Sequence, residues 1–489
     1  MLFNSYGFIF LFLPLTLAGF FLLGRSAAAI WLVAASLFFY GYWNPVYVPL
    51  LAASIVFNYF LGIRIARAES AGRGRYKRML LLFSVSANLL LLGYYKYANF
   101  FLAGVDGIAG TNYSFGEIVL PLGISFFTFT QIAYLVDTAK GWVKEYDFFH
   151  YALFVTYFPH LIAGPVLHHK EMMPQFARQE TYRFDFGNMA VGLSIFCIGL
   201  FKKTVLADGI AYYVGPVFES AAGGGHPGMA EAWIGALCYA FQIYFDFSGY
   251  SDMAIGLSRL FGVTLPLNFS SPYKSVNIIE FWRRWHMTLS RFLRDYLYIP
   301  LGGNRMGKGR RYFNLMATML LGGLWHGAGW TFLIWGGLHG LYLVINHGWH
   351  ALRRRLGQDP AVPPSAGMRM LSVTATFLAV TVAWVFFRSD NLGTALVLLK
   401  AMFGMGGLHA GVVSRGAVNW IWILLLIAML APNTQQIMRR FSPALDYKQA
   451  DETGLAWKPN GRWLAAHVAL AVFAVISISK VSEFIYFRF

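Results

Sequence analysis

Residues 312–346 read YFNLMATMLLGGLWHGAGWTFLIWGGLHGLYLVIN, and this stretch decides the class of fold. It contains no Asp, Glu, Lys or Arg. A membrane helix needs about 20 apolar residues to cross roughly 30 Å of hydrocarbon, so this run can form one long helix or two short ones. Comparable runs recur along the whole chain, which predicts an all-α polytopic membrane protein.

The apolar runs that can form membrane helices number about eleven to thirteen, and several are too short to span alone. We therefore expect about that many transmembrane helices, with re-entrant or interfacial helices between them. The candidate runs are 7–23, 27–43, 46–63, 79–103, 117–138, 149–166, 188–206, 229–250, 312–346, 367–387, 393–407, 417–436 and 463–480.

The composition favours a single integral-membrane domain over residues 1–489. Of the 489 residues, 57% are hydrophobic and only 12% are charged. Globular soluble proteins carry about 25% charged residues, and a soluble chain of this length would need them to cover several domains. The mean hydropathy of +0.52 agrees with a membrane protein.

The net charge of +17 raises the question of nucleic acid. The Lys and Arg residues, however, lie in short blocks between apolar runs, as they do in the cytoplasmic loops of membrane proteins. We therefore expect no nucleic-acid partner. Anionic lipid headgroups, or the phosphates of a cytosolic substrate, are the ligands that such blocks would attract.

The distribution of basic residues also predicts an orientation. The loop 64–78 contains six Lys or Arg residues and one acid, Glu69, so we expect it in the cytoplasm. Counting back three spans places the N-terminus outside. The loop from about 104 to 116 then also falls outside, and it has no Lys or Arg. We expect a multi-pass protein of the bacterial inner membrane.

The segment 273–311 differs from the apolar runs because cations alternate with aromatic residues along it. A charged side chain at the bilayer centre costs about 2.5–3.5 kcal/mol on insertion scales, so this segment cannot face lipid. If 279–299 forms one helix, Trp282, Trp285 and Leu289 share one side of it. The segment is therefore expected to be an interfacial or re-entrant helix at the cytoplasmic face.

Two histidines in these unusual segments are the candidate catalytic residues. His326 lies in the apolar run 312–346 with glycines on both sides, and His286 lies in the basic segment 273–311. A neutral imidazole can take the proton from a hydroxyl that attacks an acyl carbon, and a thioester donor would need no metal. A packing role for His326 stays open, because lone histidines in apolar runs usually have one.

Other polar residues suggest weaker alternatives. Asp246 and Asp252 lie close to the end of a span, where carboxylates more often bond helix ends or basic neighbours such as Arg259 than do proton chemistry. The block FPHLIAGPVLHH contains three histidines at positions 160, 168 and 169, but no Cys or carboxylate stands at metal-ligand spacing. We therefore predict no metal site.

Five blocks of this sequence together resemble the membrane-bound O-acyltransferase (MBOAT) family, and its bacterial branch that acetylates alginate in particular. The resemblance covers residues 1–350 and the tail SEFIYFRF. The blocks are PLGISFFTFTQIAYLVD, FPHLIAGPV, DFSGYSDMAIGL, EFWRRWHMTLSRFLRDYLYIPLGGN and LLGGLWHGAGWTFLIWGGLHG.

The resemblance implies helices around a central tunnel, with the invariant histidine of the family at His326 and its second polar position at His286. It further implies acetyl-CoA as the donor on the cytoplasmic side, no permanently bound cofactor, and periplasmic acetyltransferases or other polysaccharide-modifying proteins as partners. The expected activity is O-acetylation of an exported polysaccharide such as alginate. Donor phosphates would then meet the cations Lys274, Arg283, Arg284, Arg291 and Arg294.

Several alternatives compete with alginate acetylation. Relatives with the same histidine would acetylate cellulose or peptidoglycan, or transfer D-alanine to teichoic acid, and the sequence does not separate these acceptors. A transporter or flippase that relays protons is a different class of protein, but we find no inverted repeat. A non-catalytic scaffold of a polymer secretion complex is the third alternative.

Overall fold

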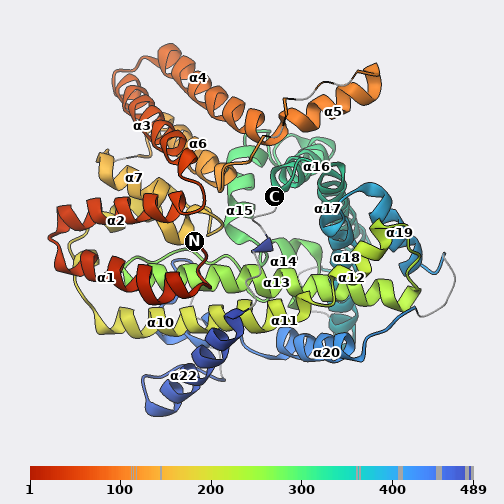
Figure 1. The fold of residues 1–489 in the computed structure, drawn as a ribbon. Helices are drawn as coiled ribbons and strands as arrows, with labels where there is room; N and C mark the ends of the chain where they lie inside the picture. The colour runs from red at the N-terminus through yellow and green to blue at the C-terminus, as the bar shows by residue number, and fades with distance from the viewer. Residues whose placement is uncertain are drawn as a thin grey trace. The chain divides into compact units, whose positions relative to one another are not determined.

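The computed structural model describes residues 1–489 apart from 112, 114, 117, 144–145, 360–361, 363–364, 406–410, 448–453, 480–483 and 486–489. Helices of different lengths make up the described part of the chain, and no β-strand occurs within it (Figure 1). The all-α class predicted from the apolar runs is confirmed.

The chain folds into two compact units, each assembled from segments that are far apart in the sequence. Unit 1 comprises residues 1–201, 250–267 and 434–481. Unit 2 comprises residues 202–249, 268–433 and 482–489. The long helix α13 (Met229–Leu260) contributes its first part to unit 2 and its last part to unit 1.

Unit 1 is built mainly from the N-terminal helices, which pack against neighbours along the chain and against helices further away in the sequence. The α3 helix contacts α4 and α6, the α1 helix contacts α2, and the α10 helix contacts α22. The helices are α1 (Leu13–Leu22), α2 (Arg25–Gly41), α3 (Val48–Ser70), α4 (Gly74–Leu92), α5 (Ala98–Ala109), α6 (Ile124–Ala139), α7 (Phe148–Thr156), α8 (Phe158–Leu161), α9 (His169–Phe176), α10 (Phe186–Phe201), α21 (Thr434–Ile437) and α22 (Gly461–Ile476).

A buried network of amides joins three helices of unit 1. Asn58 in α3 donates to Asn88 in α4 at 3.1 Å and to Gln131 in α6 at 3.1 Å. Asn88 returns a hydrogen bond to Asn58 at 2.7 Å, and Gln131 donates to Ser54 at 2.9 Å. Because lipid offers no competing partner, such bonds between membrane helices contribute about 0.6–2 kcal/mol each.

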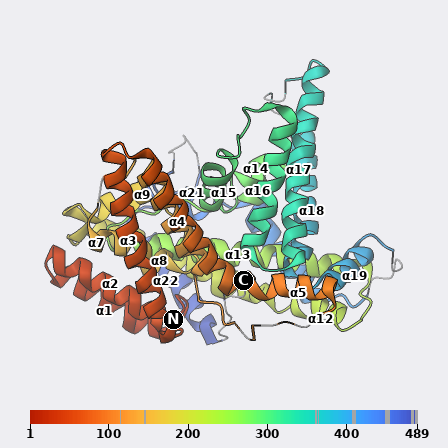
Figure 2. The same cartoon turned by 90° about the horizontal axis from the view of Figure 1, so that it is seen from above.

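Unit 2 contains the candidate catalytic residues. Its helices α16, α17 and α18 run side by side, and α17 packs against both of its neighbours (Figure 2). The helices are α11 (Asp208–Ala211), α12 (Gly215–Ala222), α14 (Ile278–Trp282), α15 (Met287–Leu293), α16 (Gly307–His326), α17 (Trp330–Arg355), α18 (Ala366–Arg388), α19 (Leu392–Met402) and α20 (Arg415–Leu430).

The α16 and α17 helices approach closely because glycines face each other where they cross. A Cβ atom added to Gly323 would lie 2.3 Å from the Phe332 carbonyl oxygen. One added to Gly336 would lie 2.3 Å from the Met319 carbonyl oxygen. Small residues at such a crossing let the two backbones come into contact, as is common between membrane helices.

The predicted apolar runs correspond to helices, although their lengths and breaks differ. Within the described part of the chain, four helical stretches are long and apolar enough to cross a membrane: 45–70, 74–109, 186–211 and 366–388. Shorter apolar helices occupy five more of the runs. The run 312–346 forms two helices, and the run 149–166 breaks at Tyr157. Pro159, two residues further on, has no N–H to continue the first helix and lies in the first turn of the next one.

Candidate active site

His286 lies at a break between the short helices α14 and α15. Its φ of 42° and ψ of 53° are left-handed, a conformation that costs roughly 1–2 kcal/mol for a residue with a Cβ atom. The prediction of one continuous helix over 279–299 is therefore wrong at this position. The break gives the imidazole a direction that a continuous helix would not allow, and strained residues of this kind concentrate at functional sites.

Asn268 fixes the orientation of the His286 ring. Its side-chain oxygen lies 3.1 Å from His286 Nδ1 and 3.0 Å from the Thr288 hydroxyl. Its main-chain carbonyl accepts from the Met287 N–H at 3.0 Å. His286 and Asn268 are fully buried. Because an amide oxygen only accepts, Nδ1 carries the proton, and Nε2 is the acceptor atom of the neutral ring.

His326 is the last residue of α16 and is 3% exposed. The backbone is extended at Gly327, and α17 begins at Trp330. A Cβ atom at Gly327 would lie 2.2 Å from the Phe332 ring, so only glycine fits there. Gly327 and Gly329 thus follow the end of α16 and place the imidazole at a turn between two long helices, so the run 312–346, which could form one helix or two, forms two.

The structure brings His286 and His326 together, with 6.3 Å between their ring centroids. Aromatic rings surround the pair. Those around His326 have centroids 4.9 Å, 5.1 Å and 5.2 Å away and belong to Trp325, Trp335 and Phe387. These rings make the surroundings of the two imidazoles apolar.

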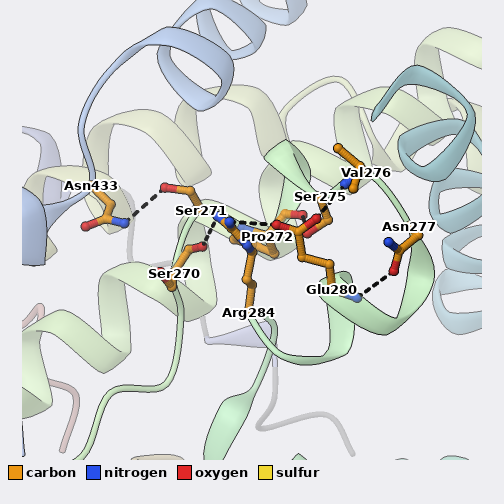
Figure 3. Close-up of polar contacts among 9 residues, drawn as sticks. All are labelled: Ser270, Ser271, Pro272, Ser275, Val276, Asn277, Glu280, Arg284 and Asn433. Carbon is orange, nitrogen blue, oxygen red and sulfur yellow. Dashed lines mark hydrogen bonds and ion pairs between the residues drawn. The ribbon is translucent and has the colours of Figure 1, made fainter. Parts of the chain in front are cut away.

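The loop before α14 is anchored by polar contacts on both sides (Figure 3). Asn433 donates to the Ser271 hydroxyl at 3.0 Å. Arg284 forms an ion pair with Glu280 at 2.7 Å, and Ser270 N–H donates to the Arg284 carbonyl at 2.9 Å. Ser271 has a φ of 48° and is, like His286, a left-handed residue with a side chain. The loop is therefore held in a strained, defined shape.

The five cations expected to meet donor phosphates lie in two kinds of surroundings. Lys274 donates to the Ala431 carbonyl at 2.8 Å, and Arg284 belongs to the anchored loop described above. Arg283 is exposed, Arg291 is half-buried, and Arg294 is exposed beside Asp295 at 2.7 Å. Lys274 and Arg284 thus support the loop before α14, whereas Arg283 and Arg294 are accessible to an anionic ligand.

A buried ion pair that the sequence did not reveal lies in unit 2. Lys203 contacts Asp246 at 2.6 Å and Asp208 at 2.9 Å, and the Lys203 and Asp246 side chains are 3% and 1% exposed. The main-chain N–H of Ile485 donates to Asp246 at 3.1 Å. Asp246 therefore ties a helix to the C-terminal tail. Within that tail, Phe484 and Ile485 are the described residues, and the rest of the motif lies outside the described part.

Asp252 has a structural environment in unit 1. It accepts from the Thr434 hydroxyl at 2.6 Å and from the Gln435 amide at 2.7 Å. Arg259, which the sequence suggested as a neighbour of such a carboxylate, donates to the Thr264 hydroxyl at 3.0 Å. The prediction that Asp252 bonds a helix end is confirmed by its contacts with α21.

The histidines of the FPHLIAGPVLHH block are buried in unit 1. His160 Nε2 lies 2.9 Å from the Phe154 carbonyl, and His169 Nδ1 lies 3.2 Å from Asp137. The carboxylate that meets His169 is distant in the sequence, so spacing along the chain did not reveal it. Among the residues that the structure describes, no group of three or more metal-ligating side chains gathers.

Asn268 and Lys203 are the polar residues of unit 2 that sequence reasoning missed. Asn268 lies in the stretch LPLNFSSPY, which has no helical period and no charge that marks it. Lys203 lies inside an apolar run, and that unusual position was the available signal. A charged side chain in such a run must find a partner, which points to buried carboxylates.

This arrangement can activate a hydroxyl next to a bound acyl group. His286 has a defined acceptor nitrogen, His326 stands beside it at a turn, and the surroundings are apolar. A general base needs a neutral acceptor within reach of the proton, and transfer to an alcohol instead of water needs a dry site. The fold and the site together define a membrane-embedded acyltransferase.

Comparison with known proteins gives the same class. The model of the MBOAT, membrane-bound O-acyltransferase family, matches residues 139–384, a range that includes both histidines. The chain belongs to this family and is an O-acyltransferase.

Individual relatives cover most of the chain. A peptidoglycan O-acetyltransferase of Helicobacter pylori is 45% identical over 86% of this chain and 83% of the relative. A probable alginate O-acetylase of Pseudomonas aeruginosa is 42% identical over 87% of this chain and 79% of the relative. A teichoic acid D-alanyltransferase of Streptococcus thermophilus is 28% identical over 54% of this chain and 68% of the relative.

Proposed function

We propose that this protein takes an acetyl group from a cytoplasmic thioester, acetyl-CoA, and passes it across the bacterial inner membrane to a hydroxyl of an exported polysaccharide. The observation that carries this proposal is the pair of buried imidazoles, His286 and His326, 6.3 Å apart within the segment matched by the family. Periplasmic acetyltransferases are the expected partners that complete the transfer.

In the proposed reaction His326 takes the proton from the attacking hydroxyl as the C–O bond to the acetyl carbon forms. The tetrahedral intermediate then expels the thiolate, breaking the C–S bond. His326 returns the proton to that sulfur, so the products are an ester and a free thiol, with no net proton change. His286, held by Asn268, orients the hydroxyl or the His326 ring.

The donor is proposed to approach from the side of the exposed cations. Arg283 and Arg294 are accessible, and the protein carries a net charge of +17. The phosphates of acetyl-CoA would be attracted there, while the thioester end enters the aromatic surroundings of the histidines. The Streptococcus relative supports D-alanyl transfer as an alternative. Its identity to this chain is lower, and its coverage shorter, than those of the two O-acetylating relatives.

Two acceptors follow from the names of the relatives: the hydroxyls of alginate and those of peptidoglycan sugars. A deletion strain complemented with the wild-type gene, and given labelled acetate, tests both. We expect ester-linked label in one isolated polymer, lost on mild alkaline treatment. Label in alginate alone or in peptidoglycan alone selects the acceptor. Equal labelling with and without the gene would contradict acetyl transfer by this protein.

Isolated membranes supply the direct test of the donor. Membranes that contain the protein should release free thiol from acetyl-CoA only when an acceptor and the partner proteins are present. Uptake of the label without thiol release would indicate a transporter instead of an acyltransferase.

A further inference from the structure

A third histidine, His339, lies in unit 2 among aromatic rings. It is fully buried in α17, within the apolar run that also carries His326. Among the described residues, neither of its ring nitrogens has a hydrogen-bond partner, and the same holds for the indole nitrogens of Trp335 and Trp282. Buried polar groups are nearly always bonded, so several unbonded nitrogens in one place indicate a ligand or ordered water.

The rings around His339 form a compact cluster from three helices. Trp335 lies 4.9 Å from His339, Trp282 lies 5.2 Å from it, and Phe281 stacks on it at 6.0 Å with an interplanar angle of 15°. Trp384 of α18 adds a further ring at 6.2 Å. Tyr342 adds a ring at 5.7 Å, and its hydroxyl donates to the Ala379 carbonyl at 3.2 Å. None of these neighbours carries a charge, so the cluster is apolar apart from its ring nitrogens and this bonded hydroxyl.

The cluster is next to the candidate active site. Trp335 touches His339 at 4.9 Å and His326 at 5.1 Å, so a single indole separates the two imidazoles. A molecule whose acyl group is at His326 would therefore place the part just beyond that group at the cluster.

The chemistry of the cluster selects a neutral, planar ligand. The indoles of Trp282 and Trp335 each donate one hydrogen bond, and a neutral imidazole adds one donor and one acceptor. An amide presents the matching groups, because its carbonyl accepts and its N–H donates. Aromatic faces also suit the methylenes on either side of an amide, and a charged ligand would lose its hydration without a counter-ion.

We propose that His339, Trp335 and Trp282 bind an amide of the arm that carries the acyl thioester, so that His339 is a binding residue for the donor. The inference rests on the proposed function, because the pantetheine arm of acetyl-CoA has this order: thioester, two methylenes, amide. The order in the protein is His326, Trp335, His339. The amide then fixes how far the arm enters, which sets the thioester carbon beside His326.

The test combines variants of His339 with a change in the donor. His339→Phe keeps the ring and removes both nitrogens, whereas His339→Gln keeps hydrogen bonding. His467→Phe is the matched control, because His467 is a buried histidine of α22 in unit 1. Initial rates are measured with acetyl-CoA and with an acetyl thioester in which an ester replaces the amide nearest to sulfur.

We expect His339→Phe to raise the KM for acetyl-CoA about tenfold with little change in kcat, and His339→Gln to recover most of the loss. The wild-type KM for the ester analogue should be higher by a similar factor. His339→Phe should raise it little further, because side chain and amide belong to one interaction. The His467→Phe control should match the wild type with both donors.

An equal rise in KM for both donors would overturn the amide assignment and indicate bound water or packing. Unchanged KM values for both His339 variants would overturn any binding role. If His339→Phe does not accumulate, Trp282→Phe takes its place in the same comparison, because it keeps an aromatic ring and removes the indole N–H that is proposed to donate to the amide. Absence of turnover by the wild type itself would instead contradict the proposed function.

Discussion

Asn268 joins two functions in one side chain: it fixes the ring of His286 and it caps the start of α15. The same oxygen accepts from His286 Nδ1 and from Thr288. Together with the left-handed backbone at His286, these contacts replace the bonds that a continuous helix would have made. The partner of His286 is far from it in the sequence, so this contact could be found only in the structure.

We expect Asn268→Ala to lower kcat by about tenfold or more, since a lost hydrogen bond to a buried polar partner costs about 1–3 kcal/mol. Thr288→Val is the matched control, because it removes one bond to Asn268 and leaves the contact with His286. Kinetics of the purified variants measure both. If Asn268 acts through His286, the double variant with His286→Ala should be no slower than His286→Ala alone. Additive losses would argue for an independent role.

The two candidate histidines could be predicted from the sequence, but the residues that hold and surround them could not. His326 stood out because a histidine among glycines in an apolar run is unusual, and His286 because it lies among cations. Asn268 and Phe387 come from other segments, and Trp335, although it lies in the same apolar run as His326, belongs to the next helix. Such contacts depend on tertiary packing, which the spacing of residues along the chain does not predict.

At the scale of elements, apolar periodicity located most helices but missed the breaks. The side chains of Trp282, Trp285 and Leu289 keep helical spacing through His286, so the pattern gave no sign of the interruption. The interruption is stabilised by Asn268 and by the anchored loop. The run 312–346 was left open as one long helix or two short ones, and the structure forms two, with the break after His326 at glycines that weaken helix.

The crossing of α16 and α17 depends on the absence of side chains at Gly336 and Gly323. We expect Gly336→Ala to destabilise the protein by about 1–3 kcal/mol, because its Cβ atom would meet the Met319 carbonyl oxygen at 2.3 Å. Gly348→Ala in the same helix is the control, since no atom lies within 4 Å of its added Cβ.

Thermal unfolding in detergent, followed by loss of the monodisperse peak in size-exclusion chromatography, measures the difference between these glycine variants. A lower midpoint for Gly336→Ala than for Gly348→Ala supports the close crossing. Equal midpoints would show that the helices are not in contact there.

For the whole molecule, composition and the placement of charges indicate the class of protein more strongly than any single motif does. An apolar chain with 12% charged residues cannot cover soluble domains, and the cations gather in loops. The class of protein was therefore predictable. The division of the chain into two units built from distant segments was not, because sequence periodicity carries no record of which helices pack together.

The orientation is a prediction that labelling can check. In a background without Cys197 and Cys238, a cysteine at Ala109 should react with a membrane-impermeant maleimide in intact cells, whereas one at Ala71 should react only after lysis. Both positions are exposed. The expectation follows from the basic segment 64–78, which the positive-inside rule places in the cytoplasm. It was predicted as a loop, but the structure forms it from the end of α3, the residues 71–73 and the start of α4. The reverse pattern of labelling would invert the topology.

The central claim is that the imidazole of His326 carries out the proton transfers of acyl transfer. The direct measurement is acetyl transfer from labelled acetyl-CoA by membranes containing equal amounts of wild-type protein, His326→Ala and the buried-histidine control His467→Ala. We predict that His326→Ala lowers the rate by about 10²–10⁴-fold, while His467→Ala stays near the wild type. Full activity of His326→Ala at normal protein levels would contradict the mechanism.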